Sequence, residues 1–205
     1  MSGDVQVRFC ERPGVRFPRA THLAMLFSLE EDARRVMAVL PKRFGKYGLT
    51  LHPEKTKLVE FIQPNRKSAG NSGGGGPGTF DLLGFTHYWG LSRWGNWAVK
   101  RKTATGRFSR ALGRLNEWCR DNRHLPVKEQ WEALVRKLRG HFGYYGIIGN
   151  AQAIHCFRDK VVAIWRRWLD RRSHSAGMTW DIMKELLKRY PLPPARIMKP
   201  RFTST

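Results

Sequence analysis

Acidic residues, cysteines and long apolar runs are scarce in this 205-residue sequence. Its three cysteines, Cys10, Cys119 and Cys156, lie far apart and form no C-x-x-C pair, which argues against a disulfide framework and against a zinc module. No stretch of about 18 apolar residues is present to span a bilayer. Charges and prolines interrupt residues 1–18, where a secretory signal would begin. We therefore expect a cytoplasmic protein in a reducing setting, with no membrane partner.

The shortage of acidic residues leaves a large positive charge. Sixteen Asp and Glu stand against 38 Lys and Arg, for a net charge of +22 at pH 7. Residues 1–62 carry a net charge of +4, and residues 63–205 carry +18. A field of this size concentrates polyanions, of which a phosphate backbone is the most common. Because 41% of the residues are hydrophobic, the chain can also form a folded core. We therefore expect a globular protein whose partner is a nucleic acid.

The N-terminal part of the sequence predicts three short strands and one helix. They are a strand at Leu23–Leu29, a helix at Glu30–Tyr47, and strands at Leu49–Leu51 and Lys57–Phe61. Pro41 is expected to kink or break the helix, and Gly48 to stop it. Residues 1–20 show no periodicity, which predicts an irregular leader. Residues 63–79 are rich in glycine and predict a flexible linker at a domain boundary.

The rest of the chain predicts a β-hairpin followed by helices. The hairpin joins Phe85–Tyr88 to Trp97–Lys100 through glycine-containing residues 90–95. Apolar stripes at helical spacing then predict three helices, with Phe108, Ala111, Leu112, Leu115 and Cys119 in the first, Trp131, Leu134, Val135 and Leu138 in the second, and Ile154, Phe157, Val161, Ile164, Trp165 and Trp168 in the third. Thr179 is a candidate N-cap for a last helix over Trp180–Tyr190, which prolines end.

Residues 140–150 change character after the second of these helices. Glycine recurs every three residues, around His141, Tyr144 and Tyr145. Exposed rings beside arginines suit stacking on the bases of a nucleic acid. The alternative is a helix end that packs its aromatic rings into the core and uses the glycines as caps. The sequence leaves both interpretations open.

Five segments carry a resemblance to one family. They are Leu49–Thr56 (LTLHPEKT), Phe80–Phe85 (FDLLGF), Trp118–Asn150, Trp165–Ser173 and Thr179–Ile197. In this order and at this spacing they resemble the bacterial group II intron reverse transcriptases. The first two are similar to the end of that family's palm and to the point where the palm meets the thumb. The other three are similar to its maturase-specific region and its C-terminal portion, so the resemblance covers residues 27–197.

The resemblance implies an α+β fold and an RNA partner. It predicts a palm remnant of one helix and short strands over residues 1–62, a Gly-rich linker over 63–79, and a frayed tail over 198–205. Residues 80–197 would form a β-hairpin and a mainly helical thumb and maturase bundle. The implied function is to bind structured RNA, above all group II intron RNA, and to assist its folding and splicing. DNA could bind through the same basic face, and the oligomeric state is left open.

The chain departs from this family at the catalytic motif. The family's palm carries Tyr-Ala-Asp-Asp where this chain has Arg19–Phe27, and no carboxylate occurs between Glu11 and Glu30. Because two-metal nucleotidyl transfer needs paired carboxylates, we expect no catalytic residue, no metal ligand and no cofactor. Mg²⁺ is expected only for a complete family member or for the intron RNA. The fingers, the upstream palm and a zinc-stabilised endonuclease are also expected to be missing. Two alternatives are a split polymerase completed by another chain, and a decayed copy without function.

The candidate RNA-binding residues are the basic, aromatic and amide side chains of the segments described above. They are Lys55, Lys57, Arg101, Lys102, Arg107, Arg110, Arg114, Arg136, Lys137, Arg139, His141, Tyr144, Tyr145, Asn150, Arg158, Arg166, Arg167, Arg171 and Arg172. The two N-terminal lysines could instead belong to a solvated turn, and the arginines of residues 107–114 to a solvated helix face. The arginines of residues 158–172 are favoured as phosphate contacts, because only Asp159 and Asp170 lie nearby as acidic partners.

Overall fold

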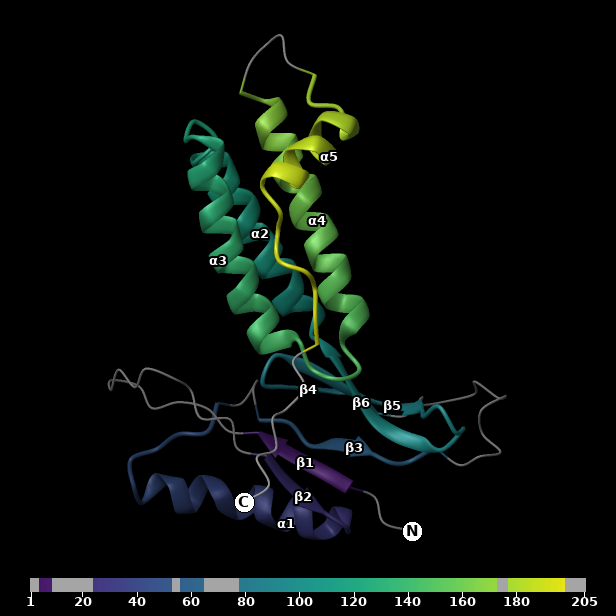
Figure 1. Ribbon diagram of the computed structural model, residues 1–205. Helices are drawn as coiled ribbons and strands as arrows, with labels where there is room; N and C mark the ends of the chain where they lie inside the picture. The colour runs from purple at the N-terminus through teal and green to yellow at the C-terminus, as the bar shows by residue number, and fades with distance from the viewer. Residues whose placement is uncertain (1–3, 9–23, 53–55, 65–77, 173–176, 198–205) are drawn as a thin grey trace, which may run out of the picture. The chain divides into compact units, whose positions relative to one another are not determined.

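The computed structural model describes residues 4–8, 24–52, 56–64, 78–172 and 177–197, and its fold is α+β, as predicted (Figure 1). The chain divides into two compact units, residues 1–100 and 101–205. Each unit has a hydrophobic cluster of its own. The division assigns most of the hairpin to the N-terminal unit, whereas the sequence groups the hairpin with the helices. The proposed palm, linker, thumb and maturase boundaries stay a prediction.

The first sheet of the N-terminal unit is antiparallel, with strand order β2-β1-β3. Its strands are β1 (Asp4–Arg8), β2 (Ala24–Phe27) and β3 (Val59–Phe61). In the central strand, Val5 pairs with Phe27 on one side and with Glu60 on the other. An irregular leader was expected over residues 1–20, and that expectation is wrong for β1. The alternation of Val5 and Val7 with polar residues is short, and the partner strands lie far along the chain, so the prediction missed this strand.

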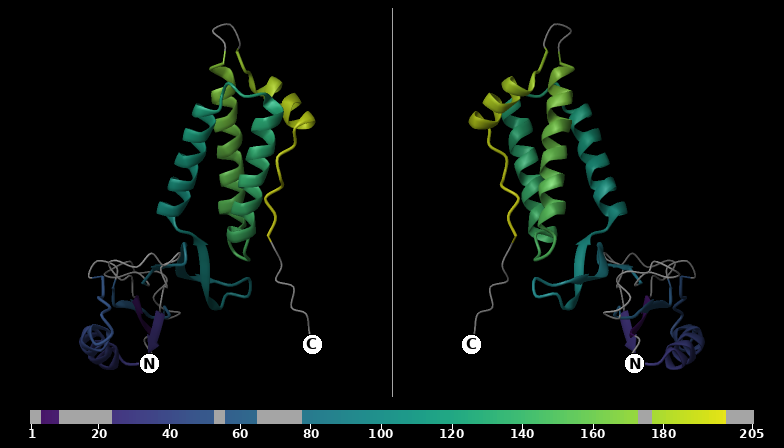
Figure 2. Two further views of the ribbon diagram at one scale, coloured as in Figure 1. Left: turned by 90° about the vertical axis from the view of Figure 1, so that its left-hand side faces the viewer. Right: turned by 90° about the vertical axis from the view of Figure 1, so that its right-hand side faces the viewer.

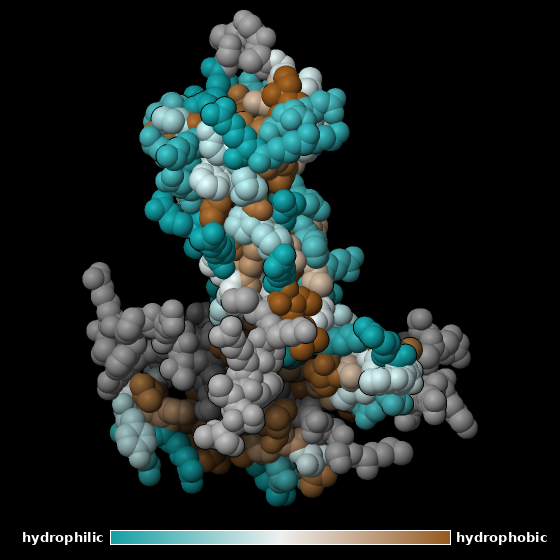
Figure 3. Space-filling view, in the orientation of Figure 1, coloured by the Kyte–Doolittle hydropathy of each residue, from teal (hydrophilic) through white to brown (hydrophobic). Residues whose placement is uncertain are grey.

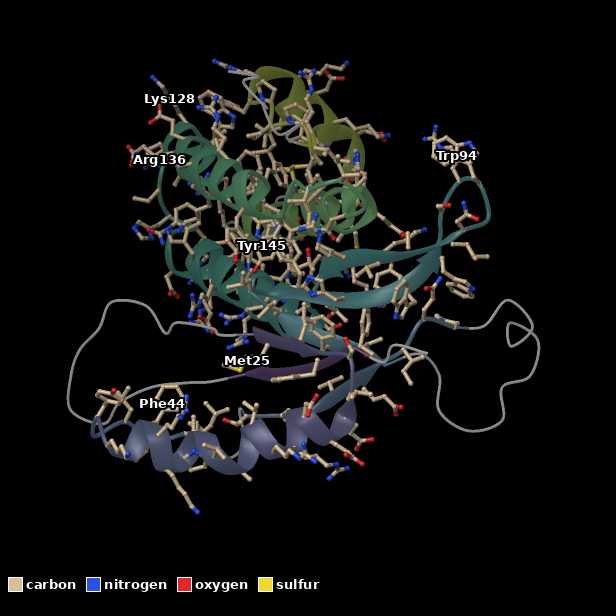
Figure 4. The ribbon with its side chains drawn as sticks, turned by 90° about the horizontal axis from the view of Figure 1, so that it is seen from below. Met25, Phe44, Trp94, Lys128, Arg136 and Tyr145 are labelled. Carbon is tan, nitrogen blue, oxygen red and sulfur yellow. The ribbon has the colours of Figure 1, made fainter. Side chains whose placement is uncertain are left out.

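Helix α1 (Glu30–Gly45) shares a hydrophobic cluster with β2. Leu40 is buried, and Met25, Phe27 and Phe44 pack around it. Figure 4 labels Met25 on β2 and Phe44 near the end of α1. Three acidic residues in the first turn of the helix and two basic residues in its last turn complement the helix dipole. The predicted helix is therefore confirmed, and its apolar side is the one that the spacing indicates.

The end of α1 differs from the prediction in one respect. The helix continues through the exposed Pro41, so the expected break does not occur. Gly48 takes a φ of 65°, and the N–H of Leu49 donates to the carbonyl of Phe44 at 3.0 Å. This bond is that of a Schellman motif, in which glycine tolerates the left-handed conformation. Residues 49–51 form no strand, which corrects that prediction, and only β3 forms from the predicted pair.

The second sheet contains the predicted hairpin and has strand order β4-β5-β6. Its strands are β4 (Phe80–Leu82), β5 (Phe85–Leu91) and β6 (Trp97–Thr103). Leu83 and Gly84 both have positive φ, which forms a tight two-residue turn between β4 and β5. Phe61 of β3 stacks on Trp89 of β5 with ring centroids 5.2 Å apart, so aromatic contacts join the two sheets. Trp94 lies at the tip of the hairpin (Figure 4).

The C-terminal unit is built on helices, and the predicted apolar stripes form its core. The helices are α2 (Thr105–Asp121), α3 (Val127–Tyr145), α4 (Ala151–Asp170) and α5 (Trp180–Arg189). Leu134, Leu138, Phe157 and Trp165 are each at most 1% exposed. Burial of such side chains contributes roughly 1.5–3 kcal/mol each to folding. Thr179 caps α5 by accepting the N–H of Ile182 at 3.3 Å, as predicted.

A buried glutamine fixes the connection between α2 and α3. Gln130 is 1% exposed, and its Nε2 donates to the carbonyls of Arg123 at 3.2 Å and Leu125 at 2.9 Å. Its Oε1 accepts the indole N–H of Trp165 at 3.0 Å. Both ends of the amide are therefore satisfied, which a polar group needs in order to be buried at low cost. The network joins α4 to the α2–α3 turn.

The chain after α5 runs beside α3, as the two views of Figure 2 show. Residues 190–197, here called the C-terminal strap, bury Leu192 and Ala195 in the core. The indole N–H of Trp131 on α3 donates to the carbonyl of Pro191 at 2.9 Å, and Nε of Arg158 on α4 donates to that of Pro193 at 3.2 Å. The strap therefore connects α3 and α4 through its own backbone.

Candidate nucleic-acid interface

The candidate residues outside the helices fall in different places. Lys55 lies outside the described residues. Lys57 is exposed in the N-terminal unit, just before β3. Arg101 and Lys102 are exposed on β6, immediately ahead of α2. The last two therefore lead into the helical unit, where most of the other candidates lie.

Helix α2 presents a basic stripe beside its apolar one. Arg107, Arg110 and Arg114 are exposed and follow the i, i+3, i+7 spacing of one helix face. Phe108 and Leu115, on the neighbouring stripe, face the core. Nε of Arg110 donates to the carbonyl of Gly106 at 2.9 Å, one turn earlier. The residue at i+11 of the same stripe is Trp118, which is not among the RNA-binding residues predicted from the sequence.

Helix α3 brings a lysine against this stripe. Nζ of Lys137 lies 5.2 Å from the centre of the Trp118 ring, within the range of a cation–π interaction. Arg136 and Arg139 are exposed on the same helix, and Arg136 projects outward in Figure 4. Trp118 could have been found from the sequence, because it continues the spacing of the α2 arginines.

The charge on these two helices is not neutralised by neighbouring carboxylates. Among the residues that the structure describes, none of the six basic side chains at 107, 110, 114, 136, 137 and 139 forms an ion pair. The described acidic groups of the C-terminal unit that do form ion pairs are Asp121, Asp159, Asp181 and Glu185, each with a basic residue one or three positions away. Residues 101–205 carry 23 Lys and Arg against eight Asp and Glu, so an excess of charge is unavoidable.

The three aromatic candidates at the end of α3 have different environments. His141 stacks on the buried Phe157 with centroids 3.6 Å apart and planes 7° apart. Burial lowers the pKa of His141 from its ordinary value of 6.5 to about 4, so the ring is neutral at pH 7. Tyr145 packs against the core, 4.6 Å from His141. Tyr144 is 52% exposed. The structure thus assigns the first two rings to packing and leaves the third at the surface.

The charges of α2 reach the end of α3. Burial raises the pKa of Tyr145, the Tyr144 hydroxyl raises it further, and the guanidinium groups of Arg107 and Arg110 act in the opposite direction. Both arginines therefore act on the Tyr145 hydroxyl through their charge. At the other end of the two helices, Lys137 meets Trp118.

We call the surface formed in this way the α2–α3 seam. It consists of Arg107, Arg110, Arg114 and Trp118 from α2, and of Lys137 and Tyr144 from α3. At about 1.5 Å of rise per residue, its α2 side extends over roughly 16 Å. Hydrophilic residues cover much of the visible bundle surface in Figure 3. The seam combines positive charge with aromatic rings, the two features that bind a nucleic-acid strand.

The arginines of α4 have partners that were not expected from the sequence. They were favoured as phosphate contacts for lack of acidic partners, and that stays a prediction, but three of them bind backbone carbonyls, which a count of acidic residues does not include. Nε of Arg158 donates to Pro193, Nη1 of Arg166 donates to Met178 at 2.6 Å, and Arg172 donates to the carbonyls of Arg123 and Leu125. These three guanidinium groups hold the strap, the start of α5 and the α2–α3 turn, so their structural role is established independently of RNA.

Arg167 and Arg171 also have partners within the bundle. Both lie over the ring of Trp168, at 5.7 and 5.0 Å from its centre. Arg167 also donates to Oδ1 of Asn116, which accepts the indole N–H of Trp168 at 2.8 Å. Their exposed guanidinium groups can still face a polyanion, although they lie outside the α2–α3 seam as defined.

Asn150 is the clearest correction among the candidate residues. Its side chain is 1% exposed, and its Oδ1 accepts the N–H of Thr103 at 2.9 Å. Its Nδ2 donates to Oγ1 of Thr103 and to the carbonyl of Tyr145, both at 2.8 Å. The amide therefore ties the α3–α4 loop to the end of β6 and has no face available for RNA.

Two further findings concern the described residues. No group of three or more His, Cys, Asp or Glu among them could hold a metal ion. None of the helices in the described part of the chain is both long enough and apolar enough to cross a membrane. In comparisons with known proteins, no family model matches the chain, and no curated protein is significantly similar to it.

Proposed function

We propose that the chain is an RNA-binding module of the maturase type, which assists the folding and splicing of group II intron RNA in the bacterial cytoplasm. The observation that supports this best is the α2–α3 seam, where exposed basic side chains, which have no carboxylate partner among the described residues, occur together with aromatic rings. The family resemblance of the sequence supplies the identity of the RNA.

The proposed activity needs no chemistry from the protein. In such a splicing reaction the RNA is its own catalyst, and the protein supplies neutralisation of phosphates and contacts complementary to the RNA's shape. A rigid bundle suits that task, because the seam residues project from two helices whose packing is fixed by a shared core. Under this proposal residues 1–62 are a remnant of a polymerase palm and contribute no catalytic group.

The test is the binding of the purified chain to a structured group II intron RNA and to an unrelated structured RNA of the same length, across a range of salt concentrations. Maturase-type binding predicts a preference for the intron RNA that survives at about 0.3 M salt, because shape-specific contacts are screened less than phosphate contacts. Equal binding that collapses for both RNAs as salt rises would contradict the proposal and leave only a basic polypeptide.

A further inference from the structure

The aromatic rings at the end of α3 form a ladder from the core to the surface. Phe157 is 1% exposed, and His141 lies parallel to it at 3.6 Å. Tyr145 follows at 4.6 Å from His141, and Tyr144 at 4.8 Å from Tyr145, with those two tyrosine planes 77° apart. Each ring packs on the one inside it, so Tyr144 is supported by its contact with Tyr145 although it is 52% exposed.

The part of the sequence around Tyr144 contains no acidic residue. No Asp or Glu occurs between Glu132 and Asp159, which covers most of α3, the α3–α4 loop and the start of α4. The guanidinium groups of Arg107 and Arg110 act on the neighbouring Tyr145 hydroxyl. An exposed ring on a rigid support, beside two arginines, offers a stacking face together with charge for the adjacent phosphates.

We propose that Tyr144 is a stacking site for one unpaired base of the bound RNA, with Arg107 and Arg110 neutralising the phosphates beside that base. The inference rests on the proposed function and adds the kind of RNA that the seam selects. A base within a continuous duplex has both faces covered by its neighbours, so only a base in a bulge, loop or single strand can stack on a side chain. The seam therefore prefers RNA with an unpaired nucleotide over uninterrupted duplex.

The residues of the ladder have separate roles in this proposal. Tyr144 contacts the base. Tyr145 and His141 are positioning residues, because they hold Tyr144 and are themselves packed against the core. Replacement of Tyr144 by Phe keeps the ring and removes only the hydroxyl, whereas replacement by Ala removes the stacking face.

The experiment uses the full chain and two RNA hairpins of identical stem sequence, one of which carries a single bulged 2-aminopurine. We expect the wild-type chain and Tyr144→Phe to prefer the bulged hairpin and to change the fluorescence of its bulged base. We expect Tyr144→Ala to lose about five- to a hundredfold in affinity for the bulged hairpin alone, the loss of one base–aromatic stack. Tyr47→Ala, which removes an exposed tyrosine of the N-terminal unit, is the matched control and should bind both hairpins as the wild type does.

The outcomes separate this inference from the function on which it rests. If Tyr144→Ala binds both hairpins as tightly as the wild type, or weakens both equally, the stacking site is wrong while RNA binding by the seam stands. If instead the wild-type chain binds neither hairpin, or loses no affinity when Arg107 and Arg110 become Gln, RNA binding by the seam is itself refuted. A loss confined to the bulged hairpin, with the fluorescence change also lost, supports the proposal.

Discussion

Gly146 and Gly143 lie one turn apart at the end of α3, but only Gly143 has room for a larger side chain. A Cβ at Gly146 would overlap the carbonyl oxygen of Phe142 and would lie 2.9 Å from that of Arg196, whereas a Cβ at Gly143 would meet nothing within 4 Å. We expect Gly146→Ala to destabilise the chain by on the order of 1–3 kcal/mol, since both neighbours are backbone. Gly143→Ala should stabilise it by roughly 0.5–1 kcal/mol, because it restricts the unfolded chain at an exposed helical site. Urea unfolding followed by helical circular dichroism measures both, and a similar effect of the two substitutions would contradict this account.

His141 should make the stability of the helical unit depend on pH. Burial lowers the pKa of His141 from 6.5 to about 4. Between these values the unfolded chain takes up a proton that the folded chain does not, so the contribution is fully present above pH 6.5 and is lost as the pH falls towards 4. His141→Phe keeps a ring on Phe157 and removes the titrating group. We expect it to flatten the fall in unfolding free energy between pH 6.5 and 4, measured by urea unfolding at several pH values.

The control for this pH dependence is His155→Gln, which changes an exposed histidine on α4 and should leave the wild-type slope intact. Carboxylates also titrate near pH 4, but they are present in all three proteins and cancel in the comparison. An unchanged slope in His141→Phe would show that His141 exchanges protons as freely in the folded chain as in the unfolded one.

Single side chains were the hardest features to predict from the sequence. Asn150 follows a glycine- and tyrosine-rich stretch, and for that reason an RNA contact was predicted there. Its side-chain amide instead forms hydrogen bonds with Thr103, 47 positions away. The role of Arg172 was inferred from a count of nearby acidic residues, and no such count includes the backbone carbonyls that it binds. In both cases the partners are distant in the chain, and local spacing cannot reveal them.

The C-terminal strap stabilises the pair α3 and α4 although it has no regular structure. Leu192 is 4% exposed in the core, while Arg196 of the same segment is exposed. Leu192→Ala should therefore cost about 2–5 kcal/mol, and Arg196→Gln, the control, less than about 0.5 kcal/mol. If the strap detaches in Leu192→Ala, the Trp131 indole N–H loses its acceptor at Pro191, so its hydrogen exchange should accelerate. Unchanged stability together with slow exchange would show that the strap does not hold the helices.

Helices were predicted well and strands only in part, for a physical reason. The stripe of α4 repeats along contiguous residues, so the sequence alone indicates which side meets the core. The β5–β6 hairpin is likewise local and was predicted. By contrast, β1 pairs with β2 and β3, which come about 20 and 55 residues later in the chain. Val5 and Val7 do alternate with polar residues, but five residues beside an unpatterned stretch were too short a signal for the prediction. Gly48 correctly marked the end of α1. The strand predicted after it, at residues 49–51, pairs with no other strand and does not form.

The distribution of charge over the chain leads to a last prediction. Arg34, Arg35 and Lys188 pair with carboxylates on their own helices, whereas the arginines of the α2–α3 seam have no such partners among the described residues. Two triple variants therefore remove the same charge from different settings. The seam variant combines Arg107→Gln, Arg110→Gln and Arg114→Gln. The control variant combines Arg34→Gln, Arg35→Gln and Lys188→Gln. Each lowers the net charge from +22 to +19. Exposed ion pairs contribute only about 0–1 kcal/mol, so the control should stay folded.

The measurement is the slope of the logarithm of RNA affinity against the logarithm of salt concentration. If the seam contacts the phosphates, its triple variant should reduce the magnitude of the slope by about 2–3, because each phosphate contact contributes about 0.7–0.9. The control variant should keep the wild-type slope, since its three residues lie outside the interface. Were both variants to reduce the slope equally, RNA would be responding to net charge alone. The identical charge of the two proteins means that only the position of the arginines can separate them.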